Sequence, residues 1–362
     1  MDLVGPAEVP VPDRCEPVLG VIAEQAALTD VHGVSRTNID ALATERMFGA
    51  PWQPNSAQRE LAERIAMADA STWFCWAQHQ TPLAALANAQ VSPSTPNVSG
   101  LQELWLERMR SGSAMAGVAF AHLRRGGLPN PQAERVSGGW RVNGSLDWVT
   151  SWDIADVVVI MVRSDDLVVS FLMPAGYSDD ELVDGVHVGE PLSLLAMGGT
   201  HTRPMLFSNA FISDDHVLAV EPWDEWWQRD AQKTIDANPA TFGVARGAIS
   251  ELALLGQERG DESISLTARA LAGSVRNCRE RAYRLSDQGD AESERIDQRV
   301  RSLDLVSQAT RAVVIARAGA AMMRGRSAER RLREAMFLQV QAQTARTRSV
   351  HLERIRTEIA AD

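Results

Sequence analysis

The sequence predicts an α+β fold in which a small β-domain lies between two helical domains. Three observations predict it: an amphipathic N-terminal third, a middle rich in β-branched runs, and a C-terminal third free of proline. All 16 prolines lie at or before Pro239, and a long proline-free tract rich in Ala, Arg, Leu and Glu is typical of helix. We therefore expect an N-terminal helical domain over 1–114, a central β-domain over 115–222 and a C-terminal four-helix bundle over 223–362.

The N-terminal helices are predicted from apolar periodicity. Leu61, Ile65 and Ala68 are spaced i, i+4 and i+7, which places them on one face of a helix. A single apolar face of this kind is buried against other elements in a folded domain.

The middle of the chain has the pattern of strands and hairpins. Trp140 and Val142 precede an Asn143-Gly144 pair, which predicts a hairpin turn at that pair. Two apolar, β-branched runs within 157–173 are separated by Asp165-Asp166, which predicts a second hairpin.

The C-terminal tract has the pattern of a helix in a bundle. Leu303, Val306, Val313 and Val314 share one helical face at i, i+3, i+10 and i+11. Charged residues occupy the other faces of the same segment, so this helix is expected to bury one side only.

Composition excludes several classes of function. The chain has 362 residues and a net charge of -11, which argues against nucleic acid as a partner because binding to phosphates requires clustered Lys and Arg. No apolar stretch of about 18 residues predicts a membrane span, and the N-terminus has no signal sequence, so we expect a cytoplasmic protein. The 3 cysteines lie far apart and are expected to be free thiols, with no metal site.

Four segments of the chain, in this order, resemble the acyl-CoA dehydrogenase family from about Leu61 to Ile355. They are Leu101 to Gly112, Gly139 to Thr150, the group Met197-Gly198 with Thr202-Arg203 and Phe207, and Arg333-Glu334-Ala335. They are similar to the family's helix before the β-domain, its strand pair ending in Trp-Ile-Thr, its exit from that domain, and the Arg-Asp-Ala that opens its closing motif.

The resemblance implies FAD as cofactor. In the family the Trp-Ile-Thr segment lies beside the isoalloxazine, which implies that Thr150 hydrogen-bonds the flavin, that Trp148 forms a wall of its site and that Val149 lies between them. Gly319 falls near a glycine motif that approaches the FAD diphosphate of a neighbouring subunit. The alternative is that Trp148 is a core aromatic residue and Thr150 an ordinary strand residue.

Two departures from the family pattern concern the substrate. The chain has 118–125 where the family has Thr-Glu-Pro and Gly-Ser-Asp, so we expect Arg124 and Arg125 either to bind a phosphate or carboxylate or to be solvated surface residues. Counting from the Arg333 motif, the family's catalytic glutamate falls on Ala342, whose methyl group takes no proton. Asp236 and Glu251 are the alternative candidates for the catalytic base, although ordinary solvated carboxylates show the same pattern.

One branch of the same fold comprises flavin monooxygenases. The segment 69–79 is similar to the helix on which those enzymes carry a histidine toward the flavin, which implies a proton-transfer role for His79. The alternative is a structural histidine satisfied by hydrogen bonds, and Gln341 stands near where that branch often has a second histidine.

Three hypotheses follow for the function. The first is an FAD-dependent oxidoreductase that carries out α,β-dehydrogenation of an acyl thioester or a related small molecule, with hydride transfer to flavin N5 and an unknown electron acceptor. The second is a monooxygenase of the same fold, and the third is a catalytically silent partner subunit. All three are consistent with a homo- or hetero-oligomer formed through the C-terminal helices.

Overall fold

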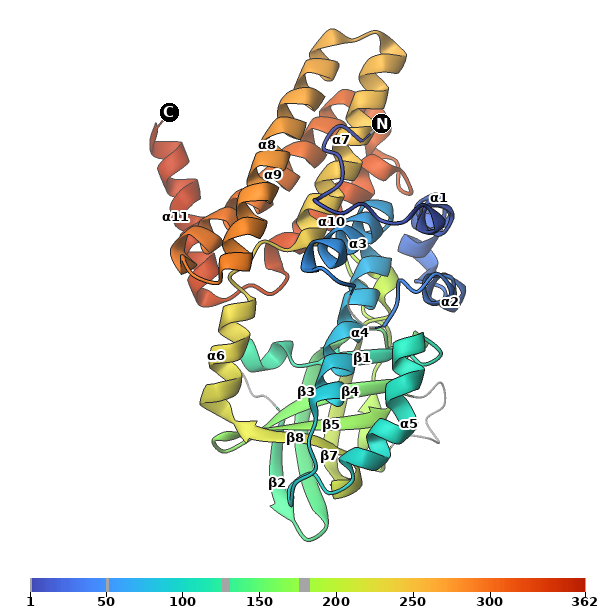
Figure 1. Ribbon diagram of the computed structural model, residues 1–362, viewed down its shortest axis with the longest axis vertical. Coiled ribbons are helices and arrows are strands. Elements are labelled where there is room, and N and C mark those ends of the chain that lie inside the picture. Colours follow the sequence, from blue (N-terminus) through green and yellow to red (C-terminus); the bar gives the residue numbers. More distant parts are fainter. Residues whose placement is uncertain (1, 50–51, 126–130, 176–182, 362) are drawn as a thin grey trace.

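The computed structural model describes residues 2–49, 52–125, 131–175 and 183–361. Helices from both ends of the chain gather at one end of the molecule, and the β-sheet lies at the other end (Figure 1). The predicted α+β class is confirmed: an N-terminal helical region, a central sheet and C-terminal helices follow one another along the chain.

The N-terminal helices lie between the sheet and the bundle and, in the case of α5, beside the sheet (Figure 1). They are α1 (Glu16–His32), α2 (Arg36–Thr44), α3 (Asn55–Ala68), α4 (Ala70–Asn88) and α5 (Val98–Ser111). Leu61, Ile65 and Ala68 are buried on α3, as the periodicity predicts. Helix α3 packs along α7 of the bundle, while α4 runs from there down to the sheet (Figure 1).

The central sheet contains antiparallel and parallel pairs. Its strands are β1 (Ala116–Ala119), β2 (Gln132–Val136), β3 (Gly139–Val149), β4 (Val157–Ser164), β5 (Leu167–Pro174), β6 (Val186–Val188), β7 (Arg203–Ser213) and β8 (Val217–Pro222). The order is β6-β7-β3-β2-β4-β5-β8, and β1 pairs in parallel with β4. The hairpin predicted at Asp165-Asp166 is confirmed, because β4 and β5 pair on either side of it from Ser164 with Leu167.

The hairpin predicted at Asn143-Gly144 is wrong. Strand β3 continues through this pair and is irregular there, with a register shift against β7 between Val142 and Gly144. The Asn143 Oδ1 accepts a hydrogen bond of 2.7 Å from the Asn209 backbone N, and Gly144 has φ 122. The pair therefore forms a bulge within a long strand, where glycine tolerates the positive φ.

The C-terminal helices form the bundle. They are α6 (Trp223–Lys233), α7 (Pro239–Arg259), α8 (Glu262–Gln288), α9 (Glu292–Arg317), α10 (Ser327–Val340) and α11 (Ala345–Ala361). Helices α7 to α10 pack on one another, while α6 leads from the sheet to the bundle and α11 diverges from the bundle (Figure 1). Leu303, Val306 and Val313 of α9 are buried in the bundle core, as predicted.

A buried ionic network joins the N-terminal segment to the bundle. Arg246 of α7 is fully buried and donates to Glu60 at 3.0 and 2.9 Å, to Glu63 at 2.7 Å and to Asp2 at 2.7 and 3.2 Å. Tyr283 of α8 also donates to Glu63, at 2.7 Å. These bonds fix α3 against α7 and α8 and hold the start of the chain on the bundle.

Candidate functional site

A cavity of about 840 Å³ lies where the sheet, α3, α4 and the end of α10 meet. Its volume is within the range of small-molecule sites, about 300–1,000 Å³. Most of the wall is apolar, with aromatic side chains from α4 and α10. The lining residues are Gln58, Arg59, Ala62, Trp73, Phe74, Trp76, Ala77, Gln78, Gln80, Thr81, Val118, Phe120, Ala121, Arg124, Arg125, Trp148, Thr150, Leu194, Leu195, Ala196, Met197, Thr200, Thr202, Asn238, Pro239, Met336, Phe337, Val340, Gln341 and Ala342.

The segment at the end of β3 reaches this cavity. Trp148 and Thr150 line it, whereas the intervening Val149 is buried in the sheet core, because successive residues of a strand point to opposite faces. Trp148 is 43% exposed, so its indole forms an open edge of the cavity and is not a core residue. Thr150 is buried, and its hydroxyl makes one hydrogen bond of 3.4 Å, to Thr202.

Arg124 and Arg125 both line the cavity, and each is paired with a carboxylate. Arg124 binds Asp230 of α6 through two bonds of 2.7 Å, and Arg125 pairs with Asp147. Arg124 is the better held of the two, since it is largely buried and its bidentate pairing fixes the guanidinium plane. Both arginines remain at the cavity wall with their charge partly neutralised.

The wall at Ala342 rests on a buried arginine that the sequence did not single out. Arg299 of α9 donates to the carbonyls of Gln341 at 2.8 Å, Ala342 at 3.3 Å and Asp236 at 3.2 Å. Burial and the nearby Arg124 lower the pKa of the Arg299 guanidinium to about 10. The periodicity of α9 shows many arginines and gives no sign of which one faces inward.

The two candidate bases lie outside the cavity lining. Asp236, between α6 and α7, accepts two bonds of 2.8 Å from Arg295, so its carboxylate is already neutralised. Glu251 of α7 is bound by Arg317 at 3.0 Å and faces Arg331. Asn238 and Pro239, which follow Asp236 closely in the chain, do line the cavity.

His79 is buried on α4, behind the cavity wall. Its Nδ1 accepts from the Ala116 backbone N at 3.0 Å, which leaves Nε2 to donate to the Met109 carbonyl, also at 3.0 Å. Burial lowers the pKa of His79 to about 4, so the ring is neutral near pH 7. Gly319 lies far along the chain in an exposed turn after α9, with open space around its Cα.

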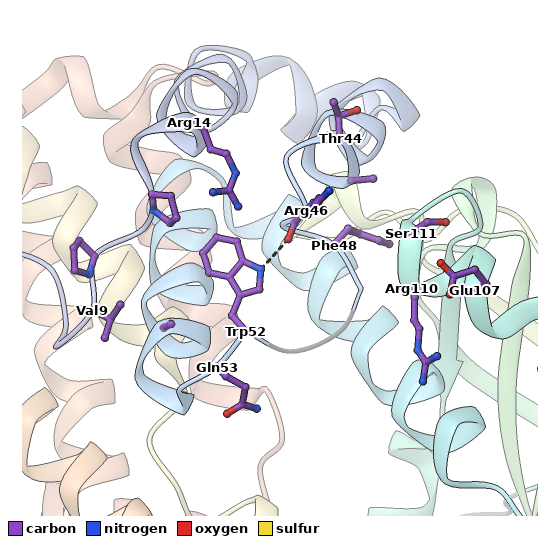
Figure 2. A pocket seen from close by; sticks show the side chains of 14 residues that line it. Val9, Arg14, Thr44, Arg46, Phe48, Trp52, Gln53, Glu107, Arg110 and Ser111 are labelled. Atoms are coloured by element: carbon purple, nitrogen blue, oxygen red, sulfur yellow. Dashed lines mark hydrogen bonds between the residues drawn. The ribbon is translucent and has the colours of Figure 1, made fainter.

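A second, more open groove of about 760 Å³ is lined in part by the described residues of the α2–α3 connection. Figure 2 shows its wall, in which the Trp52 indole donates to the Arg46 carbonyl at 2.8 Å and Arg14 and Arg110 lie nearby. None of the residues predicted for the site lines this groove.

The described part of the chain has neither a metal-binding cluster nor a helix that could span a membrane. No group of three or more His, Cys, Asp or Glu side chains among them could hold a metal ion. No helix among them combines the length and the apolar character that a membrane crossing requires.

The chain is similar in sequence to acyl-CoA dehydrogenases. No family model matches the chain. It is 26% identical over 137 residues to a mitochondrial 2-methylacyl-CoA dehydrogenase of Solanum tuberosum, covering 37% of this chain and 32% of the relative. It is 29% identical over 122 residues to a benzylmalonyl-CoA dehydrogenase of Aromatoleum aromaticum, covering 32% and 31%. The chain thus matches about a third of the length of these curated relatives.

Solved structures match over nearly the whole chain. Butyryl-CoA dehydrogenase from Megasphaera elsdenii superposes with TM-score 0.75 at 14% identity, covering 96% of this chain and 99% of that one. A glutaryl-CoA dehydrogenase from Mycobacterium smegmatis in complex with FADH2 gives 0.74 at 12%, covering 97% and 96%. A dibenzothiophene monooxygenase from Paenibacillus gives 0.72 at 16%, covering 94% and 95%. The chain has the acyl-CoA dehydrogenase fold, and the predicted resemblance to that family is confirmed.

Proposed function

We propose that the chain is an FAD-dependent oxidoreductase of the acyl-CoA dehydrogenase type, acting on an acyl thioester or a related small molecule. The observation that carries the proposal is the cavity at the end of β3, with a buried Thr150 hydroxyl beside the Trp148 indole. The relatives named above are acyl-CoA dehydrogenases, and one structural neighbour is an FADH2 complex.

The residues present fit a flavin. A flavin ring needs apolar walls and a few placed polar groups, and here aromatic residues of α4 line the same cavity as Thr150. When bound, FAD supplies the hydride acceptor. The chain's own part is to hold the ring against Trp148 and Thr150, to exclude water with its apolar walls, and to offer the charges of Arg124 and Arg125 to an anionic group of the cofactor or substrate.

The same cavity lacks a base for the family's reaction. Removing a proton from the α-carbon of a thioester requires a nearby carboxylate or another base. Among the described lining residues there is no Asp, Glu, His, Lys, Cys or Tyr, and the lining includes Ala342, the residue to which the resemblance assigns the family's glutamate position. This observation favours, as second candidates, a catalytically silent partner subunit and a monooxygenase, neither of which requires that base.

Exposed apolar residues support the proposal of an oligomer. Leu352, Ile355 and Ile359 of α11 are 55%, 43% and 71% exposed and lie at i, i+3 and i+7. They form one apolar face on a helix that diverges from the bundle (Figure 1). Whether the partner subunit is a second copy or another chain is decided by co-purification and mass measurement.

The test begins with the visible spectrum of the purified chain, followed by anaerobic addition of a panel of acyl-CoA thioesters. Bound flavin that bleaches supports dehydrogenation and requires a base other than position 342. Flavin that needs prior reduction and then consumes oxygen supports the monooxygenase. A chain that retains no flavin refutes the main proposal.

A matched pair of variants tests the missing base. Ala342→Glu places a carboxylate at the cavity wall, whereas Ala342→Gln has nearly the same shape without the charge. We expect bleaching by a thioester to appear or to rise at least about a hundredfold in the Glu variant, the lower end of the range for general-base catalysis. Equal rates in the two variants would show that position 342 does not face the reacting carbon.

A further inference from the structure

Three threonine hydroxyls at the cavity wall are linked to one another by hydrogen bonds. Thr150 follows β3, Thr200 ends a short 3-10 helix (Gly198–Thr200), and Thr202 precedes β7. All three are buried and all three line the cavity. The two segments are fixed to each other by backbone bonds from Ser151 N to the Thr200 carbonyl at 2.9 Å and from Trp152 N to the His201 carbonyl at 3.0 Å.

The direction of the hydrogen bonds follows by elimination, because each threonine has one hydroxyl proton. Thr200 donates its proton to the Met197 carbonyl at 2.8 Å. The 2.8 Å bond between Thr200 and Thr202 must therefore be donated by Thr202. With both of those protons in use, only Thr150 can donate across the 3.4 Å contact between Thr150 and Thr202.

The Thr150 hydroxyl can thus donate its hydrogen bond either to Thr202 or to a ligand in the cavity. Pointed at Thr202, it leaves the oxygen lone pairs free to accept a hydrogen bond from a ligand. Pointed at a ligand acceptor, it gives up a contact at the long limit of hydrogen-bond distances, which costs little. Thr202 is the only side-chain acceptor that the described structure offers to this buried proton, and a buried hydroxyl without an acceptor is unfavourable.

We propose that Thr202 is a positioning residue that lets the Thr150 hydroxyl change from donor to acceptor when the flavin is reduced. The inference rests on the proposed function and on Thr150 facing flavin N5. The oxidised N5 accepts a hydrogen bond and the reduced N5–H donates one, so the ligand atom reverses its role. In the reduced state the Thr202 oxygen accepts a hydrogen bond from the Thr150 hydroxyl and thereby stabilises that state relative to the oxidised one.

The test compares FAD binding and the flavin midpoint potential in Thr202→Val and Thr202→Ser. The valine variant is nearly isosteric and removes the acceptor, whereas the serine variant keeps it. We expect Thr202→Val to bind oxidised FAD within about twofold of wild type and reduced FAD about fivefold more weakly, which lowers the midpoint potential by about 20 mV. Thr202→Ser should keep the wild-type potential.

Two further variants separate this role from a packing effect. Thr241→Val removes a buried hydroxyl on α7 that is outside the group of three linked threonines and does not line the cavity, and it should leave the potential unchanged. In a Thr150→Val background, Thr202→Val should have no further effect, because the donor is gone. A wild-type chain that binds no FAD overturns the proposed function and this inference together. A wild type that binds FAD, with a potential unchanged in Thr202→Val or still shifted in the Thr150→Val background, overturns this inference alone.

Discussion

Replacing Arg246 with methionine tests whether the buried ionic network holds the N-terminal segment and α3 on the bundle. The guanidinium is fully buried and makes hydrogen bonds to the three carboxylates of Asp2, Glu60 and Glu63. Removing one partner of a buried ion pair costs about 3–5 kcal/mol, because the remaining charge stays desolvated. Glu63 retains its hydrogen bonds from Arg279 and Tyr283, so most of the lost stability is expected to come from Glu60, whose buried charge loses its cation.

The loss should depend on pH. Burial already raises the pKa of Glu60 above its ordinary value in the wild type, even with Arg246 present. Without the Arg246 guanidinium the pKa of Glu60 in the folded variant rises further. Glu60 is therefore protonated in the folded variant at pH values where it is ionised in the unfolded chain. The stability gained from that proton is present at low pH and lost as pH rises. The difference in free energy of unfolding between wild type and Arg246→Met should therefore be larger at pH 8 than at pH 5.

The assay is urea unfolding followed by far-UV circular dichroism at the two pH values. Arg281→Met is the control: Arg281 pairs with Glu294 at 2.7 Å, but both side chains are more than half exposed, so the expected cost is at most about 1 kcal/mol. The reasoning is refuted if Arg246→Met loses no more stability than this control, or if its loss is the same at both pH values.

Two further predictions concern stability. The Asp69 carboxylate accepts a hydrogen bond from the Thr72 backbone N, and burial raises the pKa of Asp69 from 3.8 to about 6. The stability that the protonated Asp69 contributes to the fold is therefore lost as pH rises from 4 to 7. Asp69→Asn keeps the helix cap and should remove this part of the pH dependence, measured as the difference in urea unfolding free energy between wild type and variant. On α7, a Cβ at Gly243 would lie 2.2 Å from the Glu63 carbonyl oxygen, so Gly243→Ala should destabilise the protein by at least about 1 kcal/mol. On α8, a Cβ at Gly273 would meet open space, so Gly273→Ala should stabilise the protein by about 0.5–1 kcal/mol. Equal shifts in melting temperature for the two variants would contradict this contrast.

The class of fold could be predicted from the sequence because its signals are local. The last proline of the chain lies where the bundle begins, and β-branched runs form strands. Leu61 and Leu303 lie on apolar helix faces that are buried in the structure. The error at Asn143-Gly144 has a tertiary cause. That pair suits a tight turn, but a turn is replaced by a bulge when β7 lies alongside and bonds to Asn143.

The site was predictable only in part. The sequence placed Trp148 and Thr150 at a strand end, and both line the cavity. It did not indicate Thr200 or Thr202 as hydroxyl partners of Thr150, since hydroxyl contacts between distant segments leave no periodic pattern. Nor did it distinguish Arg299 from the other arginines of the bundle.

Local sequence determined where helices and strands form, because apolar periodicity and backbone propensity act within a few residues of one another. Tertiary structure decided which polar groups meet. The sequence offered Asp236 as a candidate base, yet in the structure Arg295 holds its carboxylate, while Asn238 faces the cavity. Hydrogen bonds and ion pairs depend on the three-dimensional approach of segments far apart in the chain, and that approach is fixed only when the sheet and the bundle pack.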